Sequence, residues 1–224
     1  MDQAQRTKHL KGMLAYLFGG WRLPLVLILI AVIPRLAYLF IATDPFSLPG
    51  DEIYYFEIAS NVINGEGFME GNLLAYRPPL YPMFLAGSLI AFQGNLLVIR
   101  LIQVIIGAVM CLLVFHLGKR VFSTGPGLVA GLLCAVYPQM IYYNTQILPE
   151  QLLMLLVCVA VYFMVNTEKN TMFLQLVCGI AIGLTALTKE IGLFLLPAYV
   201  IWVLFNRSRI TSPLKRLALV IVGV

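Results

Sequence analysis

The sequence predicts an all-α fold: a polytopic transmembrane helix bundle whose first outer loop forms an amphipathic segment at the membrane surface. Three observations predict it. The composition is 61% hydrophobic and 11% charged, with a mean hydropathy of +0.92, which is more apolar than a soluble domain of this length. The apolar residues form long runs separated by short polar segments, and charges of opposite sign fall in different segments.

The apolar runs predict six complete spans and the start of a seventh, because about 20 apolar residues cross a bilayer. The complete spans cover residues 23–42, 97–117, 125–144, 150–166, 172–188 and 191–206, and the partial one begins at residue 215. Since the last run stops at Val224, we expect the chain to be truncated in the seventh span. The first run follows a basic tail over residues 1–22 and is too long for a signal-peptide core, so we expect it to be retained.

Residues 43–96, between the first two spans, are expected to form an outer loop. The loop ends in a short apolar run, residues 80–92, with Pro82 near its start. Because this run is short for a span, we expect an interfacial or re-entrant helix. The positive-inside rule supports this choice, since a crossing here would place Lys119, Arg120 and the basic cluster at residues 207–216 outside.

This topology separates the charges. Eleven of the 15 basic residues lie inside: Arg6, Lys8, Lys11, Arg22, Lys119, Arg120, Lys169, Arg207, Arg209, Lys215 and Arg216. Eight of the 10 acidic residues lie outside: Asp44, Asp51, Glu52, Glu57, Glu66, Glu70, Glu150 and Glu190. Acidic residues contribute little to orientation, so this bias indicates that the outer face uses them. The net charge of +5 follows from topology, which argues against nucleic acid as a partner.

Small residues in the apolar runs are assigned to packing. Four cysteines lack a CxxC spacing or a nearby His, so we expect core thiols rather than disulfides or metal ligands: Cys111, Cys134, Cys158 and Cys178. Two GxxxG patterns predict close contacts between helices, one at Gly127 and Gly131 and one at Gly179 and Gly183.

The first part of the outer loop carries the candidate catalytic residues. From Asp51 to Ile63 apolar residues recur at helical spacing, between glycines and a proline that bracket an amphipathic helix. Tyr54 and Tyr55 give this helix an aromatic belt and are candidate substrate contacts. Asp51 and Glu52, in the first turn, are suited to act as a general base or metal ligands. The alternative is that they are merely helix-start residues that favour the helix dipole.

Four more residues are candidates for binding a substrate at the outer face. Arg77 precedes two prolines, which hold its backbone extended. Arg100 lies near the outer end of the second span, and Lys189 lies between two apolar runs; a lipid phosphate is a suitable partner for such cations. The alternatives are snorkelling or local pairing, for instance of Lys189 with Glu190. Glu150 either joins the acidic site or caps its helix.

Arg35 lies inside the first span, directly after Pro34. An arginine at this depth is costly unless it is paired. We expect a structural partner for it in a neighbouring helix.

The ordered set of motifs resembles the N-terminal half of the GT-C class of polyprenyl-phosphate-sugar glycosyltransferases. The similar groups are the protein O-mannosyltransferases and the bacterial lipid A aminoarabinose transferases. The resemblance covers about residues 22–206 and rests on the arginine late in the first span and on these segments: DEIYYFEIASNVINGEGF, RPPLYPMFLAG, RLIQVIIGAVMCLLVFHLGKRVF, YPQMIYYNTQILPEQL and GLTALTKE.

The resemblance implies a GT-C-like transmembrane domain over residues 23–224 that transfers a sugar, with inversion, from a polyprenyl-phosphate carrier to an acceptor hydroxyl outside the membrane. Asp51 matches the family's general base and Glu52 completes its acidic pair. Arg77 matches a residue that helps to hold the carrier phosphate, while Glu150 and Lys189 match an acidic and a basic position. Relatives differ in metal use, so a divalent metal ion stays open, although the sequence has no recognisable metal cluster.

The partners implied are a polyprenyl-phosphate-linked sugar, a lipid, glycan or protein acceptor, and membrane lipid. The resemblance favours the bacterial inner membrane, and the charges place the N-terminus in the cytoplasm. Two alternatives remain. A subunit that transports lipid-linked solutes would have charges lining mid-membrane, and a truncated, non-catalytic scaffold would tolerate replacement of Asp51.

Overall fold

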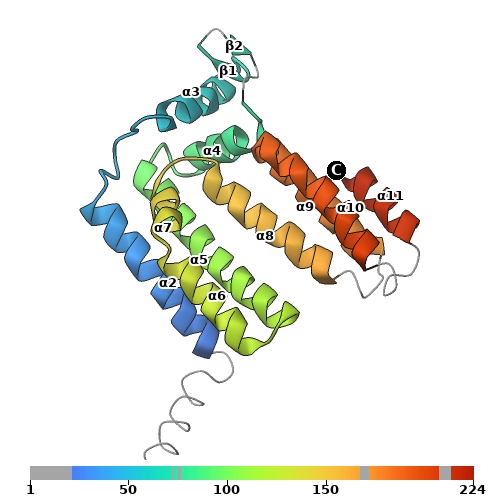
Figure 1. Ribbon diagram of the computed structural model, residues 1–224. Coiled ribbons are helices and arrows are strands. Elements are labelled where there is room, and N and C mark those ends of the chain that lie inside the picture. The colour runs from blue at the N-terminus through green and yellow to red at the C-terminus, as the bar shows by residue number, and fades with distance from the viewer. Residues whose placement is uncertain (1–21, 72, 75–76, 167–171, 207–212) are drawn as a thin grey trace, which may run out of the picture.

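The computed structural model describes residues 22–71, 73–74, 77–166, 172–206 and 213–224 (Figure 1). The predicted basic tail, apart from Arg22, lies outside the described residues, as do Lys169, Arg207 and Arg209. The elements in chain order are α2 (Arg22–Ile41), α3 (Glu52–Ile63), β1 (Met69–Glu70), β2 (Leu73–Leu74), α4 (Leu80–Ala91), α5 (Leu96–Val121), α6 (Thr124–Val136), α7 (Pro138–Thr145), α8 (Glu150–Asn166), α9 (Met172–Thr188), η2 (Glu190–Phe194), α10 (Leu195–Phe205) and α11 (Pro213–Gly223). The predicted all-α fold is confirmed.

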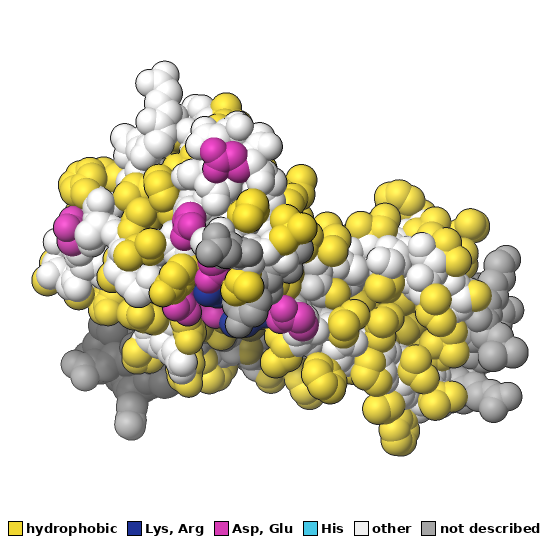
Figure 2. Space-filling view, turned by 90° about the horizontal axis from the view of Figure 1, so that it is seen from above, with side chains coloured by type: hydrophobic (Ala, Val, Ile, Leu, Met, Phe, Trp, Pro, Cys, Tyr) yellow, Lys and Arg dark blue, Asp and Glu magenta, His cyan; other side chains and the backbone are white. Residues whose placement is uncertain are grey.

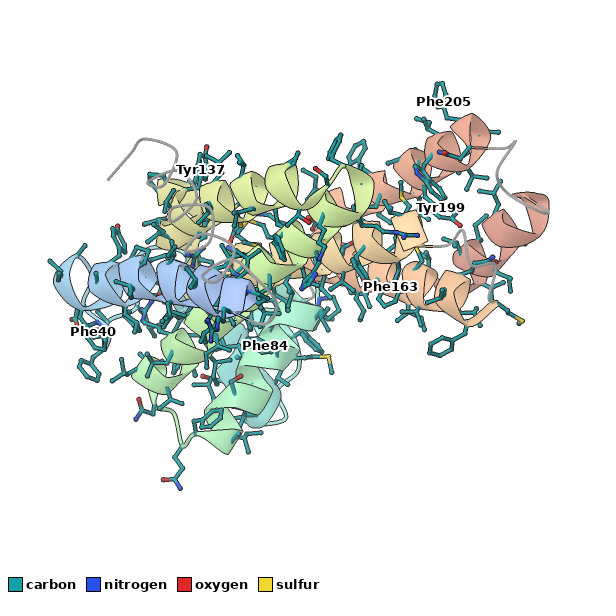
Figure 3. The ribbon with its side chains drawn as sticks, turned by 90° about the horizontal axis from the view of Figure 1, so that it is seen from below. Phe40, Phe84, Tyr137, Phe163, Tyr199 and Phe205 are labelled. Carbon is teal, nitrogen blue, oxygen red and sulfur yellow. The ribbon has the colours of Figure 1, made fainter. Side chains whose placement is uncertain are left out.

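The bundle has two packed regions. At the N-terminal end, α2, α5 and α6 share a core that includes Leu27, Met110 and Phe115, with α7 beside it. At the other end, α8, α9, α10 and α11 pack around a second core, in which Tyr199 is 1% exposed. Unlike Tyr199, Phe40 of α2 projects away from the bundle (Figure 3). Most exposed side chains on the helices are apolar, as in a protein whose solvent is hydrocarbon.

The outer loop folds as a separate layer across one end of the bundle. Helix α3 packs on α4, and both lie over the ends of α5, α8 and α9 (Figure 1). A short antiparallel hairpin, β1–β2, follows α3. It is tied to α3 by Asn61, whose side chain donates to Met69 O at 2.9 Å, and by Glu57, which accepts from Gly71 N at 3.0 Å. The predicted helix over 51–63 is therefore found one residue shorter, and the apolar run at 80–92 contains the expected short helix, α4 (Leu80–Ala91).

The helices agree in place with the predicted spans, and α8 and α9 have the predicted bounds. Among the described residues, α2 and α5 are long and apolar enough to cross a membrane, and α6 with α7 would make a third span if counted together. The 17 residues of α8 and of α9 rise about 25 Å, less than the hydrocarbon thickness. The predicted spans at 150–166 and 172–188 are thus found as short apolar helices, and residues 191–206 are found as η2 followed by α10.

The predicted span at 125–144 is found as two helices, α6 and α7, which pass for one span only when they are taken together. The chain bends by 54° between α6 and α7, where Tyr137 is extended and Pro138 starts the new helix. Proline supplies no backbone donor and disfavours a helical conformation in the residue before it, so the helix ends there.

The packing predictions for small residues are confirmed. A Cβ on Gly127 would lie 2.5 Å from the backbone nitrogen of Lys119, so α5 and α6 touch at this glycine. Gly179 faces Val220 of α11 in the same way. All four cysteines are free thiols, three of them buried.

Candidate functional site

The first turn of α3 separates the two predicted catalytic carboxylates. Asp51 is the N-cap residue of α3, but its side chain makes no capping hydrogen bond and is exposed. Glu52 points inward and is 1% exposed. Two adjacent positions on a helix differ by about 100°, so one faces water while the other is buried. The carboxylate of Asp51 is therefore accessible to a molecule outside the protein, whereas that of Glu52 is not.

Glu52 is held by Arg100 of α5. The Glu52 carboxylate accepts two hydrogen bonds, from Nη2 of Arg100 at 2.7 Å and from Nη1 at 3.2 Å, and Arg100 is also 1% exposed. Burial raises the pKa of Glu52, while the hydrogen bonds from Arg100 oppose that shift. The pair ties α3 to the second span.

Arg100 uses all of its donors within the protein. Besides Glu52, it donates to the carbonyl oxygens of Pro45 at 3.3 Å, Ser47 at 2.6 Å and Thr145. A guanidinium has five N–H groups, and these five acceptors use each of them. Arg100 therefore orders the chain before α3 and the end of α7, and this geometry has no donor left for a phosphate.

Arg77 lies at the surface between an acid and two aromatic rings. Its Nε donates to Glu70 at 2.7 Å and its Nη2 to the other oxygen at 3.2 Å. The guanidinium carbon lies 5.5 Å from the ring centroid of Tyr54 and 4.7 Å from that of Tyr55, within the range of cation–π attraction. The pKa of Arg77 is raised, chiefly by Glu70, so the guanidinium is permanently charged.

Lys189 pairs across the bundle with Glu150. Its Nζ lies 2.7 Å from Oε1 of Glu150, which starts α8, while Lys189 itself precedes η2. The alternative of a local pair with Glu190 is not what the structure shows. Glu150 raises the pKa of Lys189. The other oxygen of Glu150, Oε2, is buried and lacks a hydrogen-bond partner among the described residues.

Tyr55 lies beside Arg77 and packs on the next helix of the loop. Its ring packs edge-on against Tyr81 of α4 at 5.3 Å between centroids. Burial raises the pKa of the Tyr55 phenol, Arg77 and Lys189 oppose that shift, and Glu150 adds to it. Seen from above, basic side chains lie among acidic ones near the middle of this face (Figure 2). Within the described ranges, no group of three or more His, Cys, Asp or Glu residues could hold a metal ion.

Arg35 has the structural role that the sequence predicted. It is fully buried and donates to Asn144, to the carbonyl oxygens of Ala31 at 2.7 Å, Ala135 at 2.8 Å and Cys134 at 3.3 Å, and to the sulfur of Cys111 at 3.6 Å. These contacts again use all five donors. Two of the carbonyls are those freed where α6 breaks, so Arg35 stabilises the bend before α7.

Sequence reasoning missed three polar residues that complete these contacts. The sequence places Glu70 among the acidic residues of the outer loop but does not identify it as the partner of Arg77. Gly71 indicates a turn that reverses the chain after Glu70, and this turn could have suggested the pairing. Asn144 and Gln151 are buried and bonded to each other, and Asn144 also receives the bond from Arg35. An isolated amide in an apolar run signals such a buried network, although it does not identify the partner.

The apolar bundle and the charged, aromatic layer across one of its ends define an integral membrane protein with a candidate site at that end of its helices. The sequence profile of the dolichyl-phosphate-mannose-protein mannosyltransferase family matches residues 76–224, about two thirds of the chain. The chain belongs to this family, which consists of membrane glycosyltransferases of the GT-C type. No curated protein and no solved structure matches the chain. Arg77, Arg100, Glu150 and Lys189 lie in the matched segment, whereas Asp51, Glu52, Tyr54 and Tyr55 precede it.

Proposed function

We propose that the chain transfers a sugar, with inversion, from a polyprenyl-phosphate carrier to an acceptor hydroxyl on the extracytoplasmic side of the membrane. Asp51 removes the proton of the hydroxyl as its oxygen attacks the anomeric carbon. The bond between that carbon and the carrier phosphate breaks, and the phosphate departs with the electron pair. The acceptor is a lipid, glycan or protein, and the chain is held in the bacterial inner membrane with its N-terminus in the cytoplasm.

The assignment of the base rests on the contrast between Asp51 and Glu52. A general base needs a carboxylate that reaches the acceptor and is not already paired. Glu52 is buried against Arg100, whereas Asp51 is exposed at the same helix end. In this proposal Glu52 and Arg100 position the helix that carries Asp51.

The observation that carries the proposal is the packing of Arg77, from a later segment of the chain, on two aromatic rings of α3. Tyr54 and Tyr55 lie three and four residues after Asp51, on the same side of the helix. Arg77 packs on both rings, and the charge of Lys189 acts to lower the pKa of Tyr55. These cations would stabilise the charge that develops on the departing phosphate, and the aromatic rings offer a surface for the sugar. In the resting chain each cation pairs with a carboxylate, so the phosphate displaces Glu70 or Glu150.

The saturated contacts of Arg35 disfavour the transporter alternative. A pathway for an anionic solute needs a charged group with free donors in mid-membrane. Arg35 is fully buried and its five donors bind protein atoms of α2, α5, α6 and α7.

The test is transfer of radiolabelled sugar from polyprenyl-phosphate donors in membranes that contain the protein. Asp51→Asn keeps the shape of the side chain but cannot accept the proton, so we expect the rate to fall at least about 100-fold. Glu66→Gln is the matched control, because Glu66 is an exposed carboxylate of the same loop but lies outside the helix that carries Asp51, Tyr54 and Tyr55. Equal measurable rates for Asp51→Asn and the control would refute the assignment of the base, and the absence of transfer by the parent protein and both variants would favour the non-catalytic scaffold.

A further inference from the structure

Two pockets adjoin on the side of the bundle where α2 meets α7. One is apolar, has a volume of about 380 Å³, and is lined by Pro34, Ala37, Tyr38, Ile41, Ala42, Pro138 and Ile141. The other is polar, has a volume of about 330 Å³, and is lined by Tyr38, Ala42, Thr43, Asp44, Ser47, Pro49, Arg100, Tyr142 and Gln146. They share Tyr38 and Ala42, so an open apolar groove adjoins a polar pocket at the C-terminal end of α2.

This arrangement matches an amphiphile. Each volume is in the range of ligand sites, and the apolar pocket lies between α2 and α7. Tyr38 stands between the two pockets and packs edge-on to Tyr142, with 6.4 Å between ring centroids. A molecule that fills both pockets has an apolar chain on one side of Tyr38 and a polar head on the other.

The charges of the polar pocket select the head. Arg100 contributes no free donor, because its five N–H groups bind protein acceptors. Asp44 is exposed, and its carboxylate accepts one hydrogen bond, from Phe46 N at 3.0 Å, out of about four that it can accept. Gln146, 5% exposed, adds an amide to the wall. The pocket therefore favours a cationic donor and disfavours an anion.

We propose that the adjoining pockets bind a membrane phospholipid whose head group carries a primary ammonium. One acyl chain occupies the apolar pocket, the ammonium donates to Asp44, and the phosphate stays at the open mouth. This site lies beyond the proposed transferase site and does not depend on it. By contacting Pro138 and Ile141, the lipid stabilises α7 at its bend.

The first test uses purified, delipidated protein in detergent and phosphatidylethanolamine with a photoactivatable group in its acyl chain. Crosslinks are located by mass spectrometry. We expect them on α2 and α7, near Tyr38 and Ile141, and we expect Ala42→Trp, which fills the wall shared by the two pockets, to remove them. Crosslinks spread evenly over the apolar surface would overturn the proposal, because they would reflect general solvation by lipid.

The second test measures the head-group preference without an obstructing side chain. Lipids with identical acyl chains are compared by binding and by the midpoint of thermal unfolding: phosphatidylethanolamine, phosphatidylcholine and phosphatidylglycerol. The ethanolamine lipid should bind most tightly, since choline lacks N–H donors and glycerol leaves a net negative charge. Asp44→Asn should lower its affinity about fivefold and abolish the preference, as expected for one exposed ionic contact, whereas Glu66→Gln should retain both. A preference that survives in Asp44→Asn, or equal binding of the three lipids, would overturn the proposal.

Discussion

At the scale of single residues, the basic side chains are of two kinds: buried arginines whose N–H donors all bind protein atoms, and partly exposed residues that form an ion pair with one carboxylate. Arg35 and Arg100 are fully buried, and each uses five donors on protein acceptors. Arg77 and Lys189 are partly exposed and each binds a carboxylate. The first two maintain the structure, and the second two are placed to exchange a carboxylate for a phosphate.

The Glu52–Arg100 pair allows a residue-scale prediction. Removing one member leaves the other charge buried and unpaired, which costs about 3 kcal/mol or more, whereas removing both leaves no such charge. We therefore expect Glu52→Ala and Arg100→Ala each to lower the midpoint of thermal unfolding in detergent strongly. The double variant should be less destabilised than the sum of the two single variants.

Glu66→Ala serves as the control for this cycle, because Glu66 is exposed and should change the midpoint little. Strictly additive effects of the two single substitutions would show that the ion pair does not couple α3 to α5.

At the scale of elements, the residues that end helices decide how well the sequence predicts the structure. The sequence predicts α3 to within one residue because residues that end helices flank it on both sides. Gly50, Gly65 and Gly67 all have positive φ. The bend between α6 and α7 was missed, although Pro138 was visible. A proline in an apolar run either kinks a helix or ends it, and here buried Arg35, far away in sequence, donates hydrogen bonds to the freed carbonyl oxygens of Cys134 and Ala135. The Glu150–Lys189 pair joins residues 39 apart, and no local pattern indicates such a contact.

The contact between α5 and α6 gives the element-scale prediction. A methyl group on Gly127 would lie 2.5 Å from Lys119 N and 2.7 Å from Phe115 O, both backbone atoms that cannot rotate away. Gly127→Ala should therefore separate the helices and cost about 1–3 kcal/mol. The measurement is the midpoint of thermal unfolding in detergent.

Gly87→Ala is the matched control within α4, where an added methyl group meets nothing within 4 Å. Alanine is the better helix former, so this substitution should leave stability unchanged or raise it by up to about 1 kcal/mol. If both substitutions had the same effect, the close α5–α6 contact would not contribute as the structure indicates.

At the scale of the whole molecule, acidic and basic residues that lie in different segments of the sequence also lie at different ends of the helix bundle. The acidic layer formed by α3, the hairpin and α4 lies at one end of the bundle, and the α5–α6 turn that follows Lys119 and Arg120 lies at the other (Figure 1). An arrangement of this kind orients a chain with its basic end in the cytoplasm. The proposed site would then face the extracytoplasmic side, where α3 rests on the ends of the spans.

This orientation is testable with two introduced cysteines at exposed positions, Glu66→Cys on the outer layer and Ser123→Cys in the α5–α6 turn. Three native thiols are buried, and replacing Cys158 removes the partly exposed one. In intact bacterial cells whose outer membrane has been permeabilised, a membrane-impermeant maleimide should label position 66 and spare position 123. In inverted inner-membrane vesicles the labelling should reverse, because the other end of the bundle then faces the reagent. Labelling of position 123 alone in cells would invert the topology and place Asp51 in the cytoplasm, out of reach of an extracytoplasmic acceptor.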